Sequence, residues 1–236
     1  MTLELRSLAD DPDLVEGIEK ATLRLVVQSI TDMRDDIFAI FGTERDLVAD
    51  IGEDLTREAL DRMGTSVIPV RLFGKMDYKR SRYLFFPEFA VRQALFVDSK
   101  AEKGGAVARI QPGQTSMRIK QVRSGVEIDE PGGLPLTISH EDGDLLTTTV
   151  FVKYRYSDHS GTNTLRDISA IALPSGLLQS QYNPTAQDSI WNAGPNAPSR
   201  GEHFRARISL TRLKAKAQWR VQTIPGDPSI DYSWQD

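Results

Sequence analysis

The hydrophobic period of this chain changes at Gly64, and this change restricts the fold more than any other feature of the sequence. Before Gly64, apolar residues recur at the spacing of a helix, first over residues 14–30 and again over 53–63. Asp11 or Asp13 suits the start of the first helix, and Gly64 suits the end of the second. After Gly64 the period becomes two, which is typical of strands. The sequence therefore predicts helices first and a sheet afterwards.

The strand signals continue to the end of the chain, interrupted by turn residues such as Pro87. The stretch 103–144 is rich in Gly, Pro and charge and is the least regular part, although 117–122 could be a strand. We expect a short helix at 175–182, a helical turn at 211–216, and strands at 67–73, 78–86, 90–97, 145–156, 167–173, 204–210 and 219–224. The simplest fold is one mixed α/β (α+β) domain over 1–236, with a helical part at 1–64 and a central mixed sheet flanked by helices.

Bulk properties exclude several classes of protein. The chain has no cysteine, so disulfides, thiolate zinc sites and cysteine nucleophiles are absent. No apolar run approaches the roughly 20 residues needed to span a bilayer, and the N-terminus lacks the pattern of a signal peptide. No phosphate loop or dinucleotide fingerprint occurs, so ATP and NAD are not expected. We expect a protein of the bacterial or archaeal cytoplasm, with no membrane partner and no nucleotide cofactor.

The formal net charge is −4, yet the charge is distributed unevenly. Residues 199–220 carry seven basic residues against one acidic residue, and another basic cluster surrounds Asp77. Local potential, rather than total charge, governs attraction to phosphate. Such clusters are also common on ordinary solvated surfaces. The basic residues that could face phosphate are Lys79, Arg80, Arg200, Lys214 and Lys216.

The residues with the clearest chemistry are Asp77, Asp98 and Lys100. The apolar run 95–97 ends in Asp98-Ser99-Lys100, and the Pro87 turn lies between this run and Asp77. Two strand-end carboxylates, with the backbone carbonyl of Ser99, can hold Mg²⁺ beside a phosphate. Lys100 lies two residues after Asp98 and projects from the same face, where it can orient water and stabilise negative charge. The pattern is short, and charged strand ends without a catalytic role are common.

Further candidates are less specific. Glu53 could add a carboxylate to the metal site, or could only complement the dipole at a helix start. Arg205 and Arg207 lie at i and i+2 of an alternating strand, so both face one side, where arginine can bind guanine. The alternative is an ordinary solvent-facing strand edge. The three histidines have no metal-ligand spacing.

Together, these segments resemble the SfiI family of Type II restriction endonucleases, in the EcoRV/BglI-like branch of the PD-(D/E)xK nuclease superfamily. The resemblance runs from about Ile18 to Gln222, in the same order along the chain. The matching stretches are 18–28, 76–84, 95–100, 173–174, 181–184, 198–202 and 219–222.

The resemblance implies a restriction-endonuclease-like core with catalytic strands in 65–103 and a DNA-recognition region in 181–224. It implies Mg²⁺-dependent cleavage of both strands of duplex DNA at an interrupted palindrome with GGCC-type half-sites. Asp77 and Asp98 would bind the metal, Lys100 would be the catalytic lysine, and Arg205 and Arg207 would reach bases. Family members act as homodimers or homotetramers.

The loop before the basic strand departs from the family pattern at two positions, Pro195 and Ala197, neither of which offers a side-chain donor. Base contacts from that loop, where Asn196 is a further DNA-binding candidate, are therefore open. Two other functions also remain open: a DNA-binding protein with an inactive nuclease core, and a repair or structure-specific nuclease of the same superfamily.

Overall fold

The first part of the fold is helical, as the period of the sequence predicts. The computed structural model describes residues 5–43, 48–64, 66–68, 81–103, 107–110, 112–140, 143–159, 162–193 and 206–236. The helices at its start are α1 (Leu5–Ala9), α2 (Pro12–Asp32), α3 (Arg34–Thr43) and α4 (Val48–Arg62). The Asp11 carboxylate accepts a hydrogen bond of 3.0 Å from the backbone N–H of Leu14, which caps α2 as expected. Gly64 follows α4 with a φ of 67°. Helix α4 starts five residues before the predicted start, and α3 was not predicted.

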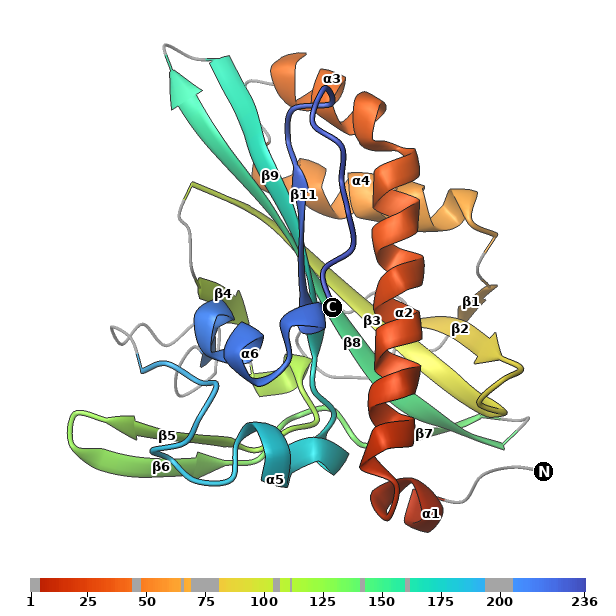
Figure 1. Ribbon diagram of the computed structural model, residues 1–236, viewed down its shortest axis with the longest axis vertical. Coiled ribbons are helices and arrows are strands. Elements are labelled where there is room, and N and C mark those ends of the chain that lie inside the picture. The colour runs from red at the N-terminus through yellow and green to blue at the C-terminus, as the bar shows by residue number, and fades with distance from the viewer. Residues whose placement is uncertain are drawn as a thin grey trace.

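A mixed sheet forms the centre of the molecule (Figure 1). Its strand order is β1-β2-β3-β8-β9-β11, with β7 paired to β8. Only β3 and β8 run parallel among these pairs, and the other pairs are antiparallel. The strands are β1 (Ser66–Ile68), β2 (Ser81–Phe86), β3 (Val91–Glu102), β7 (Thr137–His140), β8 (Gly143–His159), β9 (Thr162–Leu173) and β11 (Val221–Pro225). The predicted mixed sheet is confirmed, and the turn after Phe86 joins β2 to β3 as expected.

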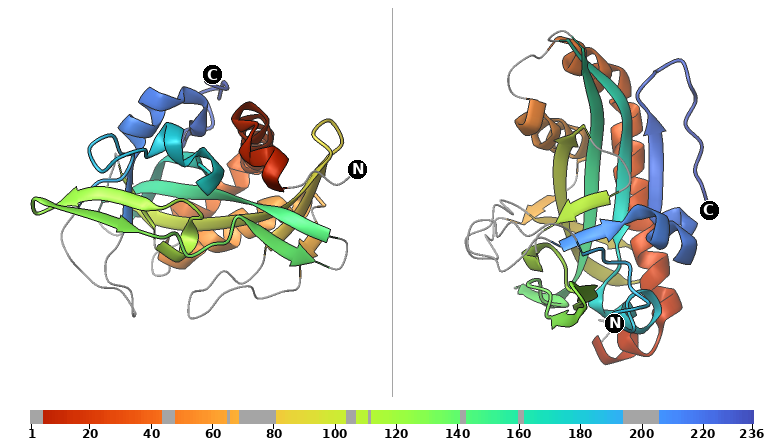
Figure 2. Two further views of the ribbon diagram at one scale, coloured as in Figure 1. Left: turned by 90° about the horizontal axis from the view of Figure 1, so that it is seen from below. Right: turned by 90° about the vertical axis from the view of Figure 1, so that its left-hand side faces the viewer.

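Two small antiparallel sheets accompany the central one. One pairs β4 (Val107–Ile110) with β10 (Ala206–Ser209), and the other is the hairpin of β5 (Ile119–Arg123) and β6 (Val126–Glu130). Figure 2 shows β4 and β10 side by side, across the long strands of the central sheet. Short helical elements complete this half: η1 (Pro112–Gln114), η2 (Gly176–Leu178), α5 (Gln179–Tyr182), α6 (Leu210–Lys216) and η3 (Gln218–Arg220).

The two faces of β3 have different neighbours. The Ser99 hydroxyl donates a hydrogen bond of 2.7 Å to Thr56 of α4, and the Thr22 hydroxyl of α2 lies 2.7 Å from the Gln93 side-chain oxygen. Because alternate residues of a strand share a face, α2 and α4 cover the face that carries Gln93 and Ser99. Asp98 therefore points to the opposite face. The core on that side includes Phe151 of β8 together with apolar residues of β4 and β10, namely Ala108, Ile110, Ala206 and Ile208.

A buried ionic cluster joins the N-terminal helix to the end of the chain. Arg220 is fully buried, and its Nη1 lies 2.7 Å from Oε2 of Glu19 on α2. Its guanidinium also lies over the rings of Tyr182 and Trp219, 4.2 and 4.3 Å from their centroids. Glu19 accepts a second hydrogen bond, of 2.7 Å, from the backbone N–H of Ser175. The cluster thus connects α2, α5 and the segment before β11.

Candidate active site

Asp98 and Lys100 occupy the interior strand β3, which is longer than predicted. The apolar residues Ala94, Leu95 and Phe96 of β3 are buried, and the strand continues through Asp98 and Lys100 to Glu102. In the parallel ladder with β8, Asp98 lies opposite Phe151 and Lys100 lies opposite Lys153. The central sheet therefore fixes the backbone on which both polar side chains are mounted.

The side chains of Asp98 and Lys100 lie together at the surface of this face. Lys100 Nζ is 3.6 Å from Asp98 Oδ2, and their side chains are 35 % and 15 % exposed, respectively. The ammonium also donates a hydrogen bond of 3.1 Å to the backbone carbonyl of Arg109 on β4. It lies 5.7 Å from the centroid of the Phe151 ring. Lys100 is thus held between a carboxylate, a carbonyl and an aromatic face.

Burial raises the pKa of Asp98 above its ordinary value. The charge of Lys100 and a hydrogen bond from the Gln114 side chain oppose this rise. Within the described part of the chain, the buried Oδ2 atom of Asp98 accepts no hydrogen bond of ordinary length, and the Lys100 ammonium lies 3.6 Å from it. A largely buried carboxylate oxygen with this incomplete hydrogen bonding is suited to a hard cation, which prefers oxygen ligands. The environment of Asp98 therefore fits a metal ligand.

The remaining metal-site candidates are only partly within the structure. Asp77 lies outside the described residues, and these contain no cluster of three or more His, Asp or Glu side chains that could bind a metal. Ser99 directs its hydroxyl toward α4, and the role of its backbone carbonyl stays a prediction. Glu53 is exposed on α4, which covers the opposite face of β3 from Asp98. The contribution of Glu53 to the site also stays a prediction.

The DNA-binding candidates are also only partly within the described residues. Arg207 is on β10, directly opposite Arg109 of β4, and is partly exposed. Lys214 and Lys216 are on α6 and are also partly exposed. The others lie outside the described residues: Lys79, Arg80, Asn196, Arg200 and Arg205. The base contact of Arg205 beside Arg207 therefore stays a prediction.

The segment before the predicted recognition loop pairs with the strand after it. The Asn192 N–H donates to the Arg207 carbonyl at 2.8 Å, and the Ser209 N–H donates to the Ile190 carbonyl at 2.9 Å. Between these bonds, Trp191 and Ile208 form an antiparallel bridge. Residues 190–192 are thereby held against β10.

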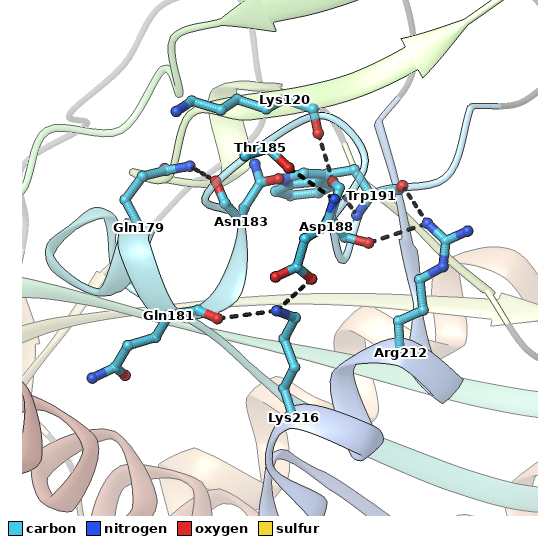
Figure 3. Close-up of polar contacts among 10 residues, drawn as sticks. Lys120, Gln179, Gln181, Asn183, Thr185, Asp188, Trp191, Arg212 and Lys216 are labelled. Carbon is cyan, nitrogen blue, oxygen red and sulfur yellow. Dashed lines mark hydrogen bonds and ion pairs between the residues drawn. The ribbon is translucent and has the colours of Figure 1, made fainter.

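Helix α6 holds the same segment by its side chains (Figure 3). Arg212 donates hydrogen bonds to the carbonyls of Ser189 and Trp191, at 3.1 and 3.3 Å. Lys216 forms an ion pair of 2.7 Å with Asp188 and donates a hydrogen bond of 3.1 Å to the Gln181 carbonyl. In the free protein, Lys216 is therefore engaged internally, and its predicted phosphate contact remains untested.

Sequence reasoning missed three residues around the site: Gln114, Lys153 and Arg212. Arg212 was visible as part of the basic cluster in 199–220, but nothing distinguished it from its neighbours. Lys153 is the single charged residue in the otherwise apolar and aromatic run 150–154, which is an unusual context for lysine. Gln114 carried no signal, because its position beside Asp98 depends on the tertiary fold.

Comparisons with known proteins agree on one family. The model of a family described as Type II restriction enzyme SfiI matches residues 19–224. The curated Type II restriction enzyme SfiI of Streptomyces fimbriatus is 32 % identical over 242 residues, which cover 95 % of this chain and 90 % of that protein. No helix within the described ranges is long and apolar enough to cross a membrane.

Two solved structures are similar to this fold. The crystal structure of the tetrameric restriction endonuclease SfiI bound to cognate DNA matches with a TM-score of 0.82 and 30 % identity, over 99 % of this chain and 91 % of that one. The restriction endonuclease BglI bound to its DNA recognition sequence matches with a TM-score of 0.71 and 17 % identity, over 94 % of each chain. At that identity, the likeness to BglI concerns the fold alone.

Proposed function

This chain belongs to the SfiI family of Type II restriction enzymes, and we propose that it cuts both strands of an interrupted, GC-rich palindrome by Mg²⁺-dependent hydrolysis. The observation that carries the proposal is the Asp98–Lys100 pair on an interior strand, with 3.6 Å between Lys100 Nζ and the largely buried Asp98 Oδ2, which accepts no hydrogen bond of ordinary length among the described residues. Enzymes of this class generally use divalent metal ions, and Mg²⁺ is the cation we propose.

Asp98 would hold the metal together with Asp77 and the Ser99 carbonyl. Strand β2 runs antiparallel to β3, with Arg82 opposite Leu95. Asp77 precedes Arg82 by five positions, and a fully extended chain spans at most about 3.3–3.6 Å per residue. The chain is therefore long enough to bring the Asp77 carboxylate beside Asp98. Bound Mg²⁺ would lower the pKa of a coordinated water and offset charge on the phosphate.

Lys100 would act on the scissile phosphate from the same face as Asp98. Its ammonium would orient the attacking water and stabilise negative charge on the phosphate oxygens as the new bond forms. Water adds to phosphorus and the bond to the 3′ oxygen breaks, which leaves a 5′-phosphate and a 3′-hydroxyl. Glu53, exposed on α4, is proposed only as an additional carboxylate near this site.

Recognition would be carried by β10 and the stretch that precedes it. Arg205 and Arg207 can each bind guanine through O6 and N7, which suits GGCC-type half-sites. We assign Arg200, Asn196, Lys79 and Arg80, with Lys214 and Lys216, to backbone contacts that position the duplex. Pro195 and Ala197 offer no side-chain donors, so bases outside the arginine contacts would be read differently than in SfiI.

Symmetric cutting of two strands requires two copies of the site, so we propose at least a homodimer on DNA. A tetramer is the second possibility, because SfiI itself was crystallised as a tetramer bound to cognate DNA. Light scattering of the complex with a duplex site would distinguish the two, and a monomer on DNA would contradict both. The cytoplasm of a bacterial or archaeal cell is the expected location.

The test is digestion of a sequenced plasmid and of genomic DNA with Mg²⁺, followed by sequencing of the ends. The proposal predicts discrete fragments, ends that share one interrupted palindrome, and no cleavage with EDTA. Binding without cleavage in both Mg²⁺ and Mn²⁺ would indicate a DNA-binding protein with an inactive core. Ends with no shared sequence would indicate a repair or structure-specific nuclease.

A further inference from the structure

Strand β4 lies between β10, which we propose recognises bases, and Lys100, which we propose acts in cleavage. On one side it pairs with β10, where Arg207 lies opposite Arg109. On the other side, the Arg109 carbonyl accepts the 3.1 Å hydrogen bond from Lys100. The Arg207 carbonyl is bonded to Asn192, on the side away from β4. Arg207 and Arg109 are therefore a non-hydrogen-bonded pair of the antiparallel ladder, in which the backbone N–H and C=O groups of each residue point away from the other strand. The Arg109 carbonyl accordingly faces Lys100 instead of β10.

A second lysine holds the same edge of β4. Lys153 of β8 donates a hydrogen bond of 2.9 Å to the carbonyl of Val107, two residues before Arg109. Carbonyls at i and i+2 of a strand point in the same direction, so Lys153 and Lys100 bind the same edge of β4. Lys153 and Lys100 are also directly opposite each other in the β3–β8 ladder. Strand β4 is thus anchored to the central sheet by two adjacent ammonium groups.

The charge of Lys153 is almost completely removed from solvent. Its side chain is 2 % exposed, and its Nζ forms an ion pair of 3.1 Å with Glu102, which is 17 % exposed. Arg109 approaches the other oxygen of Glu102 at 4.0 Å. Burying a charged pair gives little net stability compared with apolar packing, whereas losing one partner is strongly destabilising. The main effect that we assign to the Lys153–Glu102 pair is therefore to fix the position of the Lys153 ammonium, and not to add stability.

We infer that Lys153, held by Glu102, is a positioning residue that fixes β4 and thereby couples base recognition by Arg207 to the placement of Lys100. The inference rests on the proposed function. Any displacement of β10 on the DNA is transmitted through the β4 ladder to the Arg109 carbonyl. That carbonyl is one of the groups that set where the Lys100 ammonium lies. The Lys153–Glu102 pair keeps this displacement small when the correct DNA sequence is bound.

The variant that tests the anchor is Lys153→Met, which removes the charge and the hydrogen bond but keeps an unbranched side chain. Lys153→Arg retains the charge and should restore part of the function. The matched control is Lys103→Met, because Lys103 also pairs with a carboxylate next to β3 and β8, that of Asp158 at 3.3 Å, but is well exposed. If Lys153→Met does not fold, the double variant Lys153→Met/Glu102→Gln removes the unpaired carboxylate and takes its place.

The first readout needs no DNA. Hydrogen exchange should become about tenfold faster in peptides that cover 107–110 and 206–209, because a hydrogen bond from a charged donor is lost. The control Lys103→Met should leave these peptides unchanged. Unchanged exchange in the Lys153→Met protein would overturn the inference, whatever the enzyme does to DNA.

The second readout is single-turnover cleavage of a duplex that carries the site recovered from the sequenced ends, and of the same duplex with one base pair altered. We expect Lys153→Met to slow cleavage of the correct site by about 10- to 100-fold, the range for a misplaced catalytic group. The ratio of the two cleavage rates should fall, while DNA affinity stays near that of the wild type. Parallel losses of affinity and folded fraction would indicate a merely structural role.

The outcomes distinguish failure of the proposed function from failure of the inference about Lys153. If the wild type cleaves and Lys153→Met keeps both its rate and its discrimination, the inference fails and the proposed function stands. If the wild type does not cleave, the proposed function fails, and the inference fails with it. Partial recovery of the rate ratio by Lys153→Arg would support the anchor directly.

Discussion

At the scale of single residues, Asp98, the proposed metal ligand, destabilises the metal-free protein. Its carboxylate is largely buried, one oxygen accepts no hydrogen bond of ordinary length among the described residues, and its pKa is raised. A group whose folded-state pKa lies above the unfolded value stabilises the fold at low pH. That contribution is lost as the pH rises through the folded-state pKa. At neutral pH, the ionised Asp98 therefore destabilises the metal-free protein, and binding of the proposed cation would offset this.

We predict that Asp98→Asn raises the thermal stability of the metal-free protein at pH 7. The expected gain is about 0.5 to 2 kcal/mol, the usual range for a single stabilising substitution. The stability of the wild type should also fall relative to the variant as the pH increases above the ordinary pKa of aspartate. Thermal unfolding in EDTA across this pH range measures both effects. A variant less stable than the wild type at pH 7 would contradict the assignment.

The sequence could predict that Asp98 and Lys100 lie on one face of one strand, because the apolar run before them defines that strand. It could not predict Gln114 or Lys153. Gln114 approaches Asp98 from the irregular stretch after β4, so its role depends on a long-range contact. Lys153 lies in a strand pattern that indicates only burial, and its partners, Glu102 and Val107, belong to other elements.

At the scale of elements, the long strands were predicted from their periodicity, as were the short strands β5, β10 and β11, whereas the short strands β4, β6 and β7 were not. Strand β4 lies in a stretch dominated by glycine, proline and charge, and its partner β10 is distant in the sequence. Such a strand is stabilised by pairing, and its own sequence carries little signal. Helix α3 has a weak apolar stripe, with buried Ile37 and Phe41, that gave no clear helical pattern. Helix α6 was predicted, but the internal contacts that Arg212 and Lys216 make with residues 181–191 were not.

The two lysines of α6 should behave differently on DNA. Lys214→Met should reduce the slope of log K for DNA binding against log salt concentration by about the contribution of one phosphate contact. It should have little effect on stability. Lys216→Met should lower the melting temperature, because it breaks the ion pair with Asp188 and the bond to the Gln181 carbonyl. Binding titrations at several salt concentrations and thermal melts distinguish them. Equal changes in salt dependence would show that Lys216 leaves its internal partners on DNA.

At the scale of the whole molecule, the segments that resemble the SfiI family meet in the interior as well as at the proposed site. Glu19, Tyr182 and Arg220 come from three of these segments and converge in one buried cluster. The order of the segments was visible in the sequence, but their convergence was not, because it joins α2 to the end of the chain. The cluster sets α2 against the elements that lead into β11.

We predict that Arg220→Met destabilises the protein by about 3 to 5 kcal/mol, because it leaves the Glu19 carboxylate buried without its cation. The double variant Glu19→Gln/Arg220→Met should recover part of this loss. Urea denaturation of the wild type, the single variants and the double variant closes the cycle. Purely additive losses would show that the 2.7 Å pair does not act as a unit.

The most direct test of the proposed active site is single-turnover cleavage by the wild type and Asp98→Asn on one duplex with Mg²⁺, with DNA binding measured in parallel. We predict that Asp98→Asn binds the duplex at least as tightly as the wild type, because recognition is assigned to β10 and the stretch before it. We also predict a fall of about 10³-fold or more in the cleavage rate, because a proposed metal ligand is lost. Cleavage by Asp98→Asn at the wild-type rate would contradict the placement of the active site on β3.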